Sequence, residues 1–160
     1  LDGACVVCDS VGGVETQSET VWRQADRYNV PRMCFVNKMD ITGANFQRTV
    51  DQIKSRLGSN PVRLQLPYFK GDDFEGIIDL IEMQLAIWDG ESLGAKFTLV
   101  DIPEDALDDA THVSADLIES LSDHDESIID VYLDGKEIDI ERIIKAIICP
   151  TTDFAIVPAI

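Results

Sequence analysis

A run of four apolar residues that ends in a polar tetrapeptide is the strongest constraint in this 160-residue sequence. Residues 33–36 (MCFV) predict a buried strand, and residues 37–40 (NKMD) follow it directly. If that strand belongs to a parallel sheet, the tetrapeptide lies at the carboxyl edge, where open α/β sheets bind their ligands. The flanking segments therefore decide whether residues 37–40 form a ligand site.

The segments before the tetrapeptide have the pattern of a strand followed by a helix. Residues 1–8 form an apolar run that is typical of a buried strand. Thr16 and Glu19 have the spacing of a capping box, which predicts a helix that opens at Thr16. The face of this helix that we expect to point inward carries Val21, Trp22, Ala25 and Tyr28.

A second amphipathic helix follows the tetrapeptide. Gly43 and Asn45 are typical of a helix start, and Gly58 suits a left-handed cap at the helix end. The apolar stripe between them consists of Phe46, Val50, Ile53 and Leu57. Strand, helix, strand and helix in this order predict an α/β fold with a parallel sheet.

The side chains of the tetrapeptide match the chemistry of guanine. The Asp40 carboxylate can accept two parallel hydrogen bonds, from the ring N–H and the exocyclic amine of guanine, and adenine offers no such edge. Asn37 can bond the opposite edge of the base, and the alkyl stem of Lys38 can lie across the purine face. These residues resemble the N-K-x-D motif of GTPases, so Asn37, Lys38 and Asp40 are the candidate nucleotide-binding residues.

The phosphate-binding half of a GTPase site has no counterpart in this sequence. No segment matches the phosphate-binding pattern G-x-x-x-x-G-K-[ST]. Asp9 and Gly12 match D-x-x-G, but only 28 positions separate Asp9 from Asn37, whereas such GTPases place a further strand and helix between the two motifs. We therefore predict no catalytic and no metal-binding residue here, expect the Mg²⁺ ligands outside this segment, and expect the segment alone to be inactive.

Charge divides the sequence into a nearly neutral part and an acidic part. Residues 1–70 carry 9 basic and 7 acidic groups, whereas residues 101–142 carry 2 basic and 15 acidic groups. A cluster of helix-breaking residues at 58–61 marks the boundary of the first part. The remaining patterns predict strands at residues 62–66, 76–80, 85–88 and 96–100 and helices at residues 103–122, 126–133 and 138–148.

The first of these helices is strongly acidic. The carboxylates that we expect on its outward face are Asp108, Asp109, Asp116, Glu119 and Asp123. Such a face can be solvated without any partner, or it can be a docking face for another protein. Direct contact with nucleic acid is not expected, because both surfaces would be negatively charged.

Several longer stretches closely resemble the bacterial elongation factor G family. They are residues 1–4 (LDGA), 9–11 (DSV), 13–15 (GVE), 17–25 (QSETVWRQA), 30–32 (VPR), 35–40 (FVNKMD), 43–46 (GANF), 64–67 (LQLP), 74–80 (FEGIIDL) and 101–103 (DIP). Ile41 and Thr16 depart from the family, which usually has a basic residue and a proline there. The resemblance covers nearly the whole chain.

This resemblance implies the middle of a GTPase domain together with its inserted subdomain. The expected fold is a partial P-loop-type GTPase domain with a parallel sheet, plus an inserted α+β subdomain. Residues 1–60 would belong to the GTP-binding domain, residues 61–149 to the acidic insertion, and residues 150–160 to the return strand, expected at 154–159. The parent protein would bind GTP or GDP with Mg²⁺ in the cytoplasm and would drive ribosomal translocation of tRNA and mRNA.

The resemblance also implies partners for the acidic insertion. In the elongation factor G family this subdomain engages the ribosomal stalk protein, which favours a docking role for Asp116, Glu119 and Asp123. Two alternatives stay open. One is another translational GTPase, such as a release factor or a ribosomal protection protein, which would share the N-K-x-D motif but not the amino-acid sequence of residues 19–25. The other is a stand-alone acidic protein-binding module without catalysis.

The cysteines and the hydropathy pattern suggest no further chemistry. Cys5 and Cys8 form a C-x-x-C pattern, but on a strand they would face opposite sides and could not hold a metal together. We expect these two residues, Cys34 and Cys149 to be reduced and buried. No apolar stretch approaches the roughly 18 residues of a membrane span, so no membrane partner is predicted.

Overall fold

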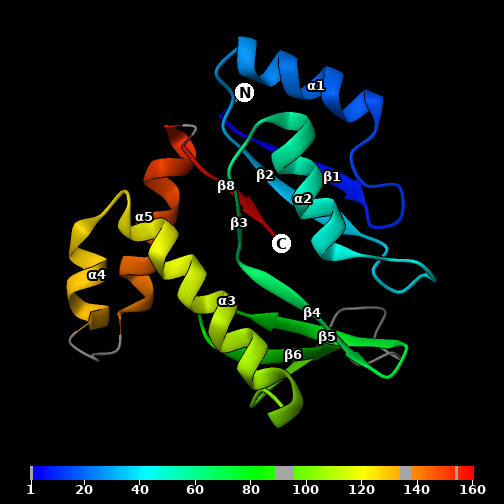
Figure 1. The fold of residues 1–160 in the computed structure, drawn as a ribbon, viewed down its shortest axis with the longest axis vertical. Coiled ribbons are helices and arrows are strands. Elements are labelled where there is room, and N and C mark those ends of the chain that lie inside the picture. Colours follow the sequence, from blue (N-terminus) through cyan, green and yellow to red (C-terminus); the bar gives the residue numbers. More distant parts are fainter. Residues whose placement is uncertain (1, 89–95, 134–137, 154) are drawn as a thin grey trace. The chain divides into compact units, whose positions relative to one another are not determined.

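A computed structural model describes residues 2–88, 96–133, 138–153 and 155–160. The chain forms two compact units, residues 1–62 with 144–160 (unit 1) and residues 63–143 (unit 2). Figure 1 labels most of the helices and strands of both units. The division into a GTP-binding domain and an inserted subdomain stays a prediction, because compactness alone assigns no role to either unit.

Unit 1 is built on a four-stranded sheet of order β1-β2-β8-β3 (Figure 1). Its strands are β1 (Ala4–Asp9), β2 (Arg32–Asn37), β3 (Pro61–Arg63) and β8 (Val157–Ala159). β1 runs parallel to β2, from Ala4 opposite Arg32 to Asp9 opposite Asn37, and β8 is also parallel to β2. The predicted α/β fold with a parallel sheet is therefore confirmed.

Two strands are shorter or shifted relative to their predicted ranges. β1 pairs with β2 only from Ala4 onward, because Pro31 precedes β2 and has no N–H to donate. The return strand β8 starts at Val157 because the N–H groups of Ala155 and Ile156 donate to the carbonyl of Pro150 instead. Residues 1 and 154, which belonged to the predicted strands, lie outside the described residues.

Helix α1 (Thr16–Arg27) does not open with the predicted capping box. Glu15 is the N-cap residue and its side chain makes no capping hydrogen bond, while Thr16 is already helical. The Glu19 carboxylate instead pairs with the Arg56 guanidinium, with an N···O distance of 2.6 Å. An ion pair with a guanidinium is a stronger attraction for the carboxylate than a neutral N–H at the helix start.

The inward face of α1 is narrower than predicted. Trp22 is buried, whereas Val21 is 56% exposed and Tyr28 is 71% exposed. The indole packs into a core cluster with Val14, Cys34, Ile53 and Val157. One large ring thus takes the place of the broad apolar stripe that the sequence suggested.

Helix α2 (Phe46–Leu57) agrees with its sequence signals at both ends. The Asn45 side chain accepts a hydrogen bond from the Arg48 N–H at 2.8 Å, which satisfies a free donor of the first turn. Gly58 ends the helix with φ of +65°, in the left-handed region that favours glycine. The buried residues of α2 are Phe46, Thr49, Val50 and Ile53.

The two faces of the sheet in unit 1 differ in burial. Cys8 and Cys34 are buried on the face that α1 and α2 cover. On the opposite face Val7 is 58% exposed and Phe35 is 39% exposed. Cys5 shares the Val7 side of β1 and is exposed, so Cys5 and Cys8 do face opposite sides.

Two cysteine predictions are wrong for the same reason. Cys5 and Cys149 are exposed rather than buried, although both follow apolar neighbours in the sequence. An apolar run marks a segment that enters a core, but it does not say which side chains of the strand or helix point inward.

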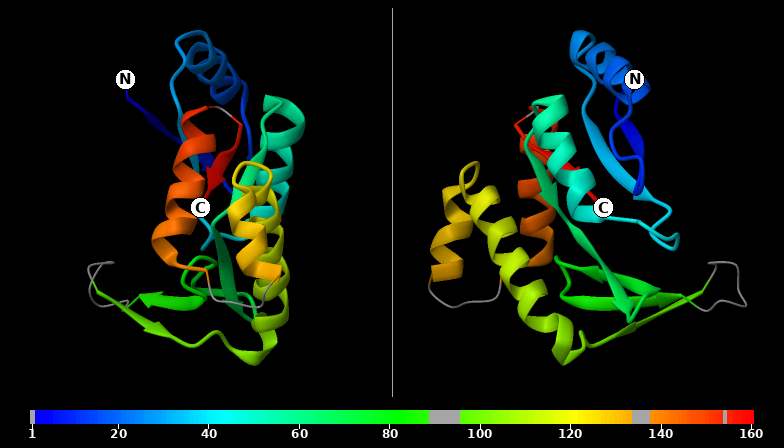
Figure 2. Two further views of the ribbon diagram at one scale, coloured as in Figure 1. Left: turned by 90° about the vertical axis from the view of Figure 1, so that its left-hand side faces the viewer. Right: turned by 45° about the vertical axis from the view of Figure 1, so that its right-hand side comes forward.

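Unit 2 combines an antiparallel sheet with helices (Figure 2). The sheet has the order β4-β5-β6-β7, with β4 (Gln65–Lys70), β5 (Asp73–Asp79), β6 (Gln84–Trp88) and β7 (Phe97–Val100). The helices of this unit are α3 (Glu104–Ser122) and α4 (Glu126–Leu133). Helix α5 (Ile140–Thr152) begins in unit 2, and its residues from 144 onward belong to unit 1. The predicted strand at 62–66 is two strands, β3 and β4, because the chain leaves one sheet and enters the other there.

A tight turn connects β5 to β6, and a hydrogen bond joins this turn to α3. The Asp79 carboxylate accepts hydrogen bonds from the N–H groups of Ile81 at 2.8 Å and Glu82 at 3.0 Å. Close by, the Ser114 hydroxyl on α3 donates to the Leu80 carbonyl at 3.3 Å. A carboxylate that bonds its own backbone two and three residues on is a common way to close such a turn.

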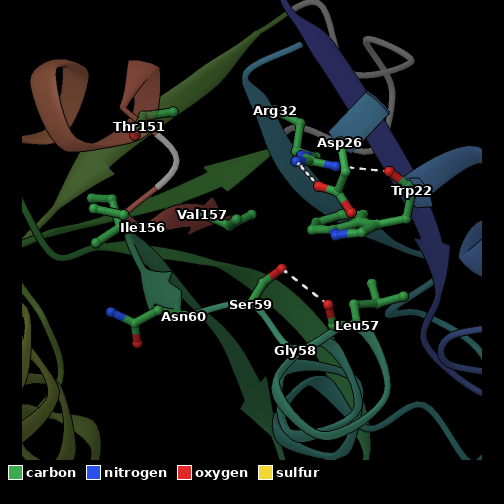
Figure 3. A pocket seen from close by; sticks show the side chains of 11 residues that line it. Trp22, Asp26, Arg32, Leu57, Gly58, Ser59, Asn60, Thr151, Ile156 and Val157 are labelled. Atoms are coloured by element: carbon green, nitrogen blue, oxygen red, sulfur yellow. Dashed lines mark hydrogen bonds and ion pairs between the residues drawn. The ribbon is translucent and has the colours of Figure 1, made fainter. Parts of the chain in front are cut away.

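Arg32 is a buried cation at the start of β2. Its guanidinium donates to the Trp22 carbonyl at 3.0 Å, pairs with the Asp26 carboxylate, and lies 4.4 Å from the centre of the Trp22 ring. These groups line one side of a cavity of about 280 Å³, whose other side is formed by residues 57–60 and by Ile156 and Val157 (Figure 3). Arg32 thus ties the first residue of β2 to α1.

We expect Arg32→Ala to destabilise the fold by about 2–4 kcal/mol, because it removes a buried guanidinium together with its hydrogen bond and cation–π contact to Trp22 and its ion pair with the half-exposed Asp26. Urea unfolding followed by tryptophan fluorescence measures this change. Arg23→Ala is the matched control, since the Arg23 side chain is 81% exposed and reaches Glu19 only at 4.0 Å. Its effect should stay within about 0.5 kcal/mol, and equal effects of the two variants would contradict a structural role for Arg32.

Candidate functional site

Two loops leave the sheet of unit 1 at the same edge. Because β1 and β2 are parallel and Asp9 lies opposite Asn37, residues 10–15 and residues 38–45 start side by side (Figure 1). Asn37, the first residue of the N-K-x-D tetrapeptide, ends β2, and its other three residues begin the second loop. This edge is the carboxyl edge of the sheet, as predicted.

Ser10 joins the two loops and is completely buried. Its N–H donates to the Asn37 carbonyl at 3.0 Å, and its hydroxyl donates to the Lys38 carbonyl at 2.6 Å. Its own carbonyl accepts the Asn45 N–H at 3.0 Å. Ser10 therefore fixes the backbone at both the start and the end of residues 37–45.

Arg48 braces the same region from α2. Its guanidinium donates to the Ser10 carbonyl at 3.2 Å and also to the Val11 carbonyl. Because the Arg48 N–H is bonded to the Asn45 side chain, the helix start is connected to both loops. Neither Ser10 nor Arg48 was predicted from the sequence, since hydrogen bonds between distant segments leave no periodic pattern.

Lys38 has an unusual backbone and a paired side chain. Its φ is +64°, in the left-handed region that non-glycine residues rarely adopt. Its ammonium lies 2.7 Å from the Asp9 carboxylate. The other oxygen of Asp9 accepts hydrogen bonds from the N–H groups of Val11 and Gly12, each at 2.8 Å. The strained residue is thus held by its carbonyl, through Ser10, and by its ammonium, through Asp9.

This pairing shifts both ionisation equilibria. The hydrogen bond from Lys38, with the two backbone N–H groups, lowers the pKa of Asp9 to about 2. The same pair raises the pKa of Lys38. The contribution of Asp9 to folding stability is complete above its ordinary pKa of about 3.9. The contribution of Lys38 to folding stability is complete below its ordinary pKa of about 10.4. The stability that the ion pair contributes is therefore complete between about pH 4 and pH 10, and it is lost as the pH falls through the lowered pKa of Asp9.

The three candidate residues lie on one exposed loop. Asn37, Lys38 and Asp40 are all exposed, whereas Met39 between them is half-buried. An incoming ligand can therefore reach all three side chains. From the sequence we considered Asp9 only as a phosphate sensor and missed its pairing with Lys38, although both residues follow the ends of adjacent predicted strands.

The acidic candidates on α3 have different surroundings. Asp116 pairs with Arg63 at 2.9 Å, so it does not point freely outward as expected. Glu119 and Asp123 are exposed. The Asp116 side chain is still 45% exposed, so all three carboxylates reach solvent, but Arg63 offsets the charge of Asp116.

The described residues contain neither a metal cluster nor a membrane span. Among them, no group of three or more His, Cys, Asp or Glu side chains is arranged to hold a metal ion. Within the same part of the chain, no helix is both long and apolar enough to cross a membrane.

Comparison with known proteins identifies the family. Residues 1–155 match the family model of the elongation factor Tu GTP binding domain. The chain belongs to this family. It is 50% identical, over all 160 of its residues, to elongation factor G of Wolbachia pipientis subsp. Culex pipiens (strain wPip). The predicted resemblance to elongation factor G and the predicted class of GTP-binding domain are both confirmed.

A solved structure supports the fold of this GTP-binding domain independently. A crystal structure of a protein from Thermus thermophilus matches 99% of the chain with a TM-score of 0.83, at 23% sequence identity. The chain covers 23% of that protein, and it likewise spans 23% of the length of the Wolbachia relative. The predicted combination of a GTPase-type parallel sheet with an α+β part is thus confirmed as a fold.

We expect Lys38→Met to raise the pKa of Asp9 from about 2 towards its ordinary value. The pKa should remain somewhat below that value, because the Val11 and Gly12 N–H groups still favour the charged carboxylate. A pH titration of the Asp9 carboxyl carbon by NMR measures the midpoint. Lys54→Met, which removes an exposed lysine from α2, is the control and should leave the midpoint unchanged. The same midpoint in Lys38→Met would contradict the ion pair.

Proposed function

We propose that this chain is the central part of an elongation factor G, in which Asn37, Lys38 and Asp40 select guanine nucleotides. The observation that carries the proposal is the 50% identity to an elongation factor G along the entire chain. The full protein would hydrolyse GTP and use it to promote ribosomal translocation of tRNA and mRNA in the cytoplasm.

The proposed guanine contacts follow from the chemistry of the three side chains. The Asp40 carboxylate accepts the ring N–H and the exocyclic amine of guanine, and a base without these donors leaves it unsatisfied. The Asn37 amide bonds the opposite edge of the base. The alkyl stem of Lys38 covers one face of the purine. The exposure of all three side chains on one braced loop supports this assignment.

The phosphates and the metal would bind elsewhere in the protein. The family of GTP-binding domains implies GTP or GDP together with Mg²⁺, and this sequence contains no phosphate-binding loop. We propose that segments outside this chain hold the phosphates and Mg²⁺ and carry out hydrolysis. The chain itself contributes base selection and no catalytic residue.

The exposed face of the sheet in unit 1 supports the proposal that more of the domain exists. Parallel sheets occur almost only with both faces covered, because their strands are apolar on both sides. Val7 and Phe35 are exposed apolar side chains on the face that α1 and α2 do not cover. Additional helices of a complete GTP-binding domain would bury them.

We further propose that the acidic helix α3 docks a basic surface of the ribosomal stalk protein. Its exposed carboxylates include Glu119 and Asp123, and the segment from residue 101 to residue 142 carries 15 acidic groups against 2 basic ones. Charge complementarity would speed the encounter with a basic partner and would keep ribosomal RNA away.

In the full-length protein, Asp40→Asn should shift the preference from guanosine to xanthosine nucleotides. The new amide can donate to the carbonyl that xanthine has in place of the guanine amine, and it loses the paired acceptor that guanine needs. Competition of GDP and xanthosine diphosphate for the site measures this preference. Asp51→Asn, an exposed carboxylate on α2, is the control and should keep the preference for guanosine. Unchanged preference in Asp40→Asn would contradict the guanine assignment.

Replacing both Glu119 and Asp123 with Lys should lower stalk-dependent stimulation of GTP hydrolysis several-fold, because the attraction to a basic partner becomes repulsion. Nucleotide affinity should not change. The control replaces Asp72 and Asp73 with Lys, which makes the same charge change at exposed positions in or beside β5. If both double variants reduce stimulation equally, only the net charge matters and α3 is not the docking site.

A further inference from the structure

Asp9, the last residue of β1, contacts one of the three proposed guanine-binding residues. One carboxylate oxygen lies 2.7 Å from the Lys38 ammonium, and the other accepts the N–H groups of Val11 and Gly12 at 2.8 Å each. The Asp9 side chain is only 28% exposed, whereas the Lys38 side chain is 57% exposed. A carboxylate that is fixed by its own loop thus holds the flexible end of a lysine from the neighbouring loop.

We propose that Asp9 is a positioning residue for purine binding, which anchors the Lys38 ammonium so that the lysine stem forms one wall of the base site. This inference rests on the proposed role of Asn37, Lys38 and Asp40 in guanine recognition. Asp9 itself touches no nucleotide in this proposal and acts through Lys38.

The physical advantage of such an anchor is that it orders the lysine before the nucleotide arrives. An unanchored lysine samples many rotamers and loses that freedom when a base packs against its stem. Here the Lys38 backbone is held through its carbonyl by Ser10, and its ammonium is held by Asp9. Both ends of the stem are therefore fixed, and ligand binding has less conformational entropy to remove.

The proposed contact predicts no effect of Asp9 on the selectivity between guanine and hypoxanthine. The lysine stem covers the face of the base, and every purine has such a face. Asp40 reads the edge, where guanine presents two donors and hypoxanthine presents one. Loss of the Asp9 anchor should therefore lower the affinities for guanine and hypoxanthine nucleotides by the same factor. A change at Asp40 should instead alter the ratio of these two affinities.

Asp9→Asn in the full-length protein tests the anchor. The amide oxygen can still accept the N–H groups of Val11 and Gly12, so the turn is preserved while the ion pair with Lys38 is lost. Displacement of a fluorescent GDP analogue by GDP and by inosine diphosphate measures both affinities. We expect each to fall about two- to five-fold, the range of an exposed ion pair, with their ratio unchanged.

Asp79→Asn is the matched control for the turn itself. The Asp79 carboxylate accepts the N–H groups of Ile81 and Glu82 in the same way, but in unit 2. The substitution removes one negative charge from the same kind of turn, and both affinities should stay unchanged. Equal losses in Asp79→Asn and Asp9→Asn would overturn the proposal.

A double-mutant cycle with Lys38→Met separates positioning from a general structural effect. If Asp9 acts through Lys38, Asp9→Asn causes no further loss of GDP affinity once Lys38 is replaced. A loss of the same size in the Lys38→Met background would overturn the proposal, because Asp9 would then act by another route.

Asp40→Asn distinguishes failure of this inference from failure of the proposed function. If Asp40→Asn alters the ratio of GDP to inosine diphosphate affinity while Asp9→Asn leaves both affinities unchanged, the guanine site stands and the anchor is wrong. If neither variant changes any affinity, the guanine site itself is wrong, and the anchor fails with it.

Discussion

The parallel pairing of β1 with β2 is the interaction on which the candidate site depends. Six consecutive residue pairs, ending with Asp9 opposite Asn37, bring two loops that are far apart in the sequence to one edge of the sheet. A shift of this register by one residue would turn every side chain of β1 to the other face and separate Asp9 from Lys38. The buried cluster around Trp22, Cys34 and Ile53 holds that register, because those side chains fit only one face of the sheet.

At the carboxyl edge of this sheet, beyond the apolar core, polar contacts hold the loops in place. Ser10 is completely buried and bonds to both ends of the tetrapeptide loop, and Arg48 adds a second connection from α2. Buried polar groups that are fully hydrogen-bonded make a loop rigid and unique. Such rigidity suits the proposed guanine-binding role of the loop, because that selectivity would depend on where Asn37 and Asp40 lie before the nucleotide binds.

The sequence predicted the helices and strands well where local chemistry decides them. Asn45 and Gly58 bound α2 as expected, since a capping side chain and a left-handed glycine act within a few residues. The prediction failed at Glu19, where a distant Arg56 attracts the carboxylate more strongly than the helix start does. It also failed for Tyr28 and Cys149, because periodicity shows which residues share a face but not how much of that face another element covers.

By itself, the sequence determined the class of the fold, the family and the tetrapeptide whose chemistry fits guanine. These follow from residue types, spacing and local order, which the chain carries without folding. Only the tertiary structure decided that Asp9 pairs with Lys38, that Ser10 bridges the two loops, and that Arg63 pairs with Asp116 on α3. Each of these contacts joins residues at least 28 positions apart, and their meeting depends on how strands and helices pack rather than on any local pattern.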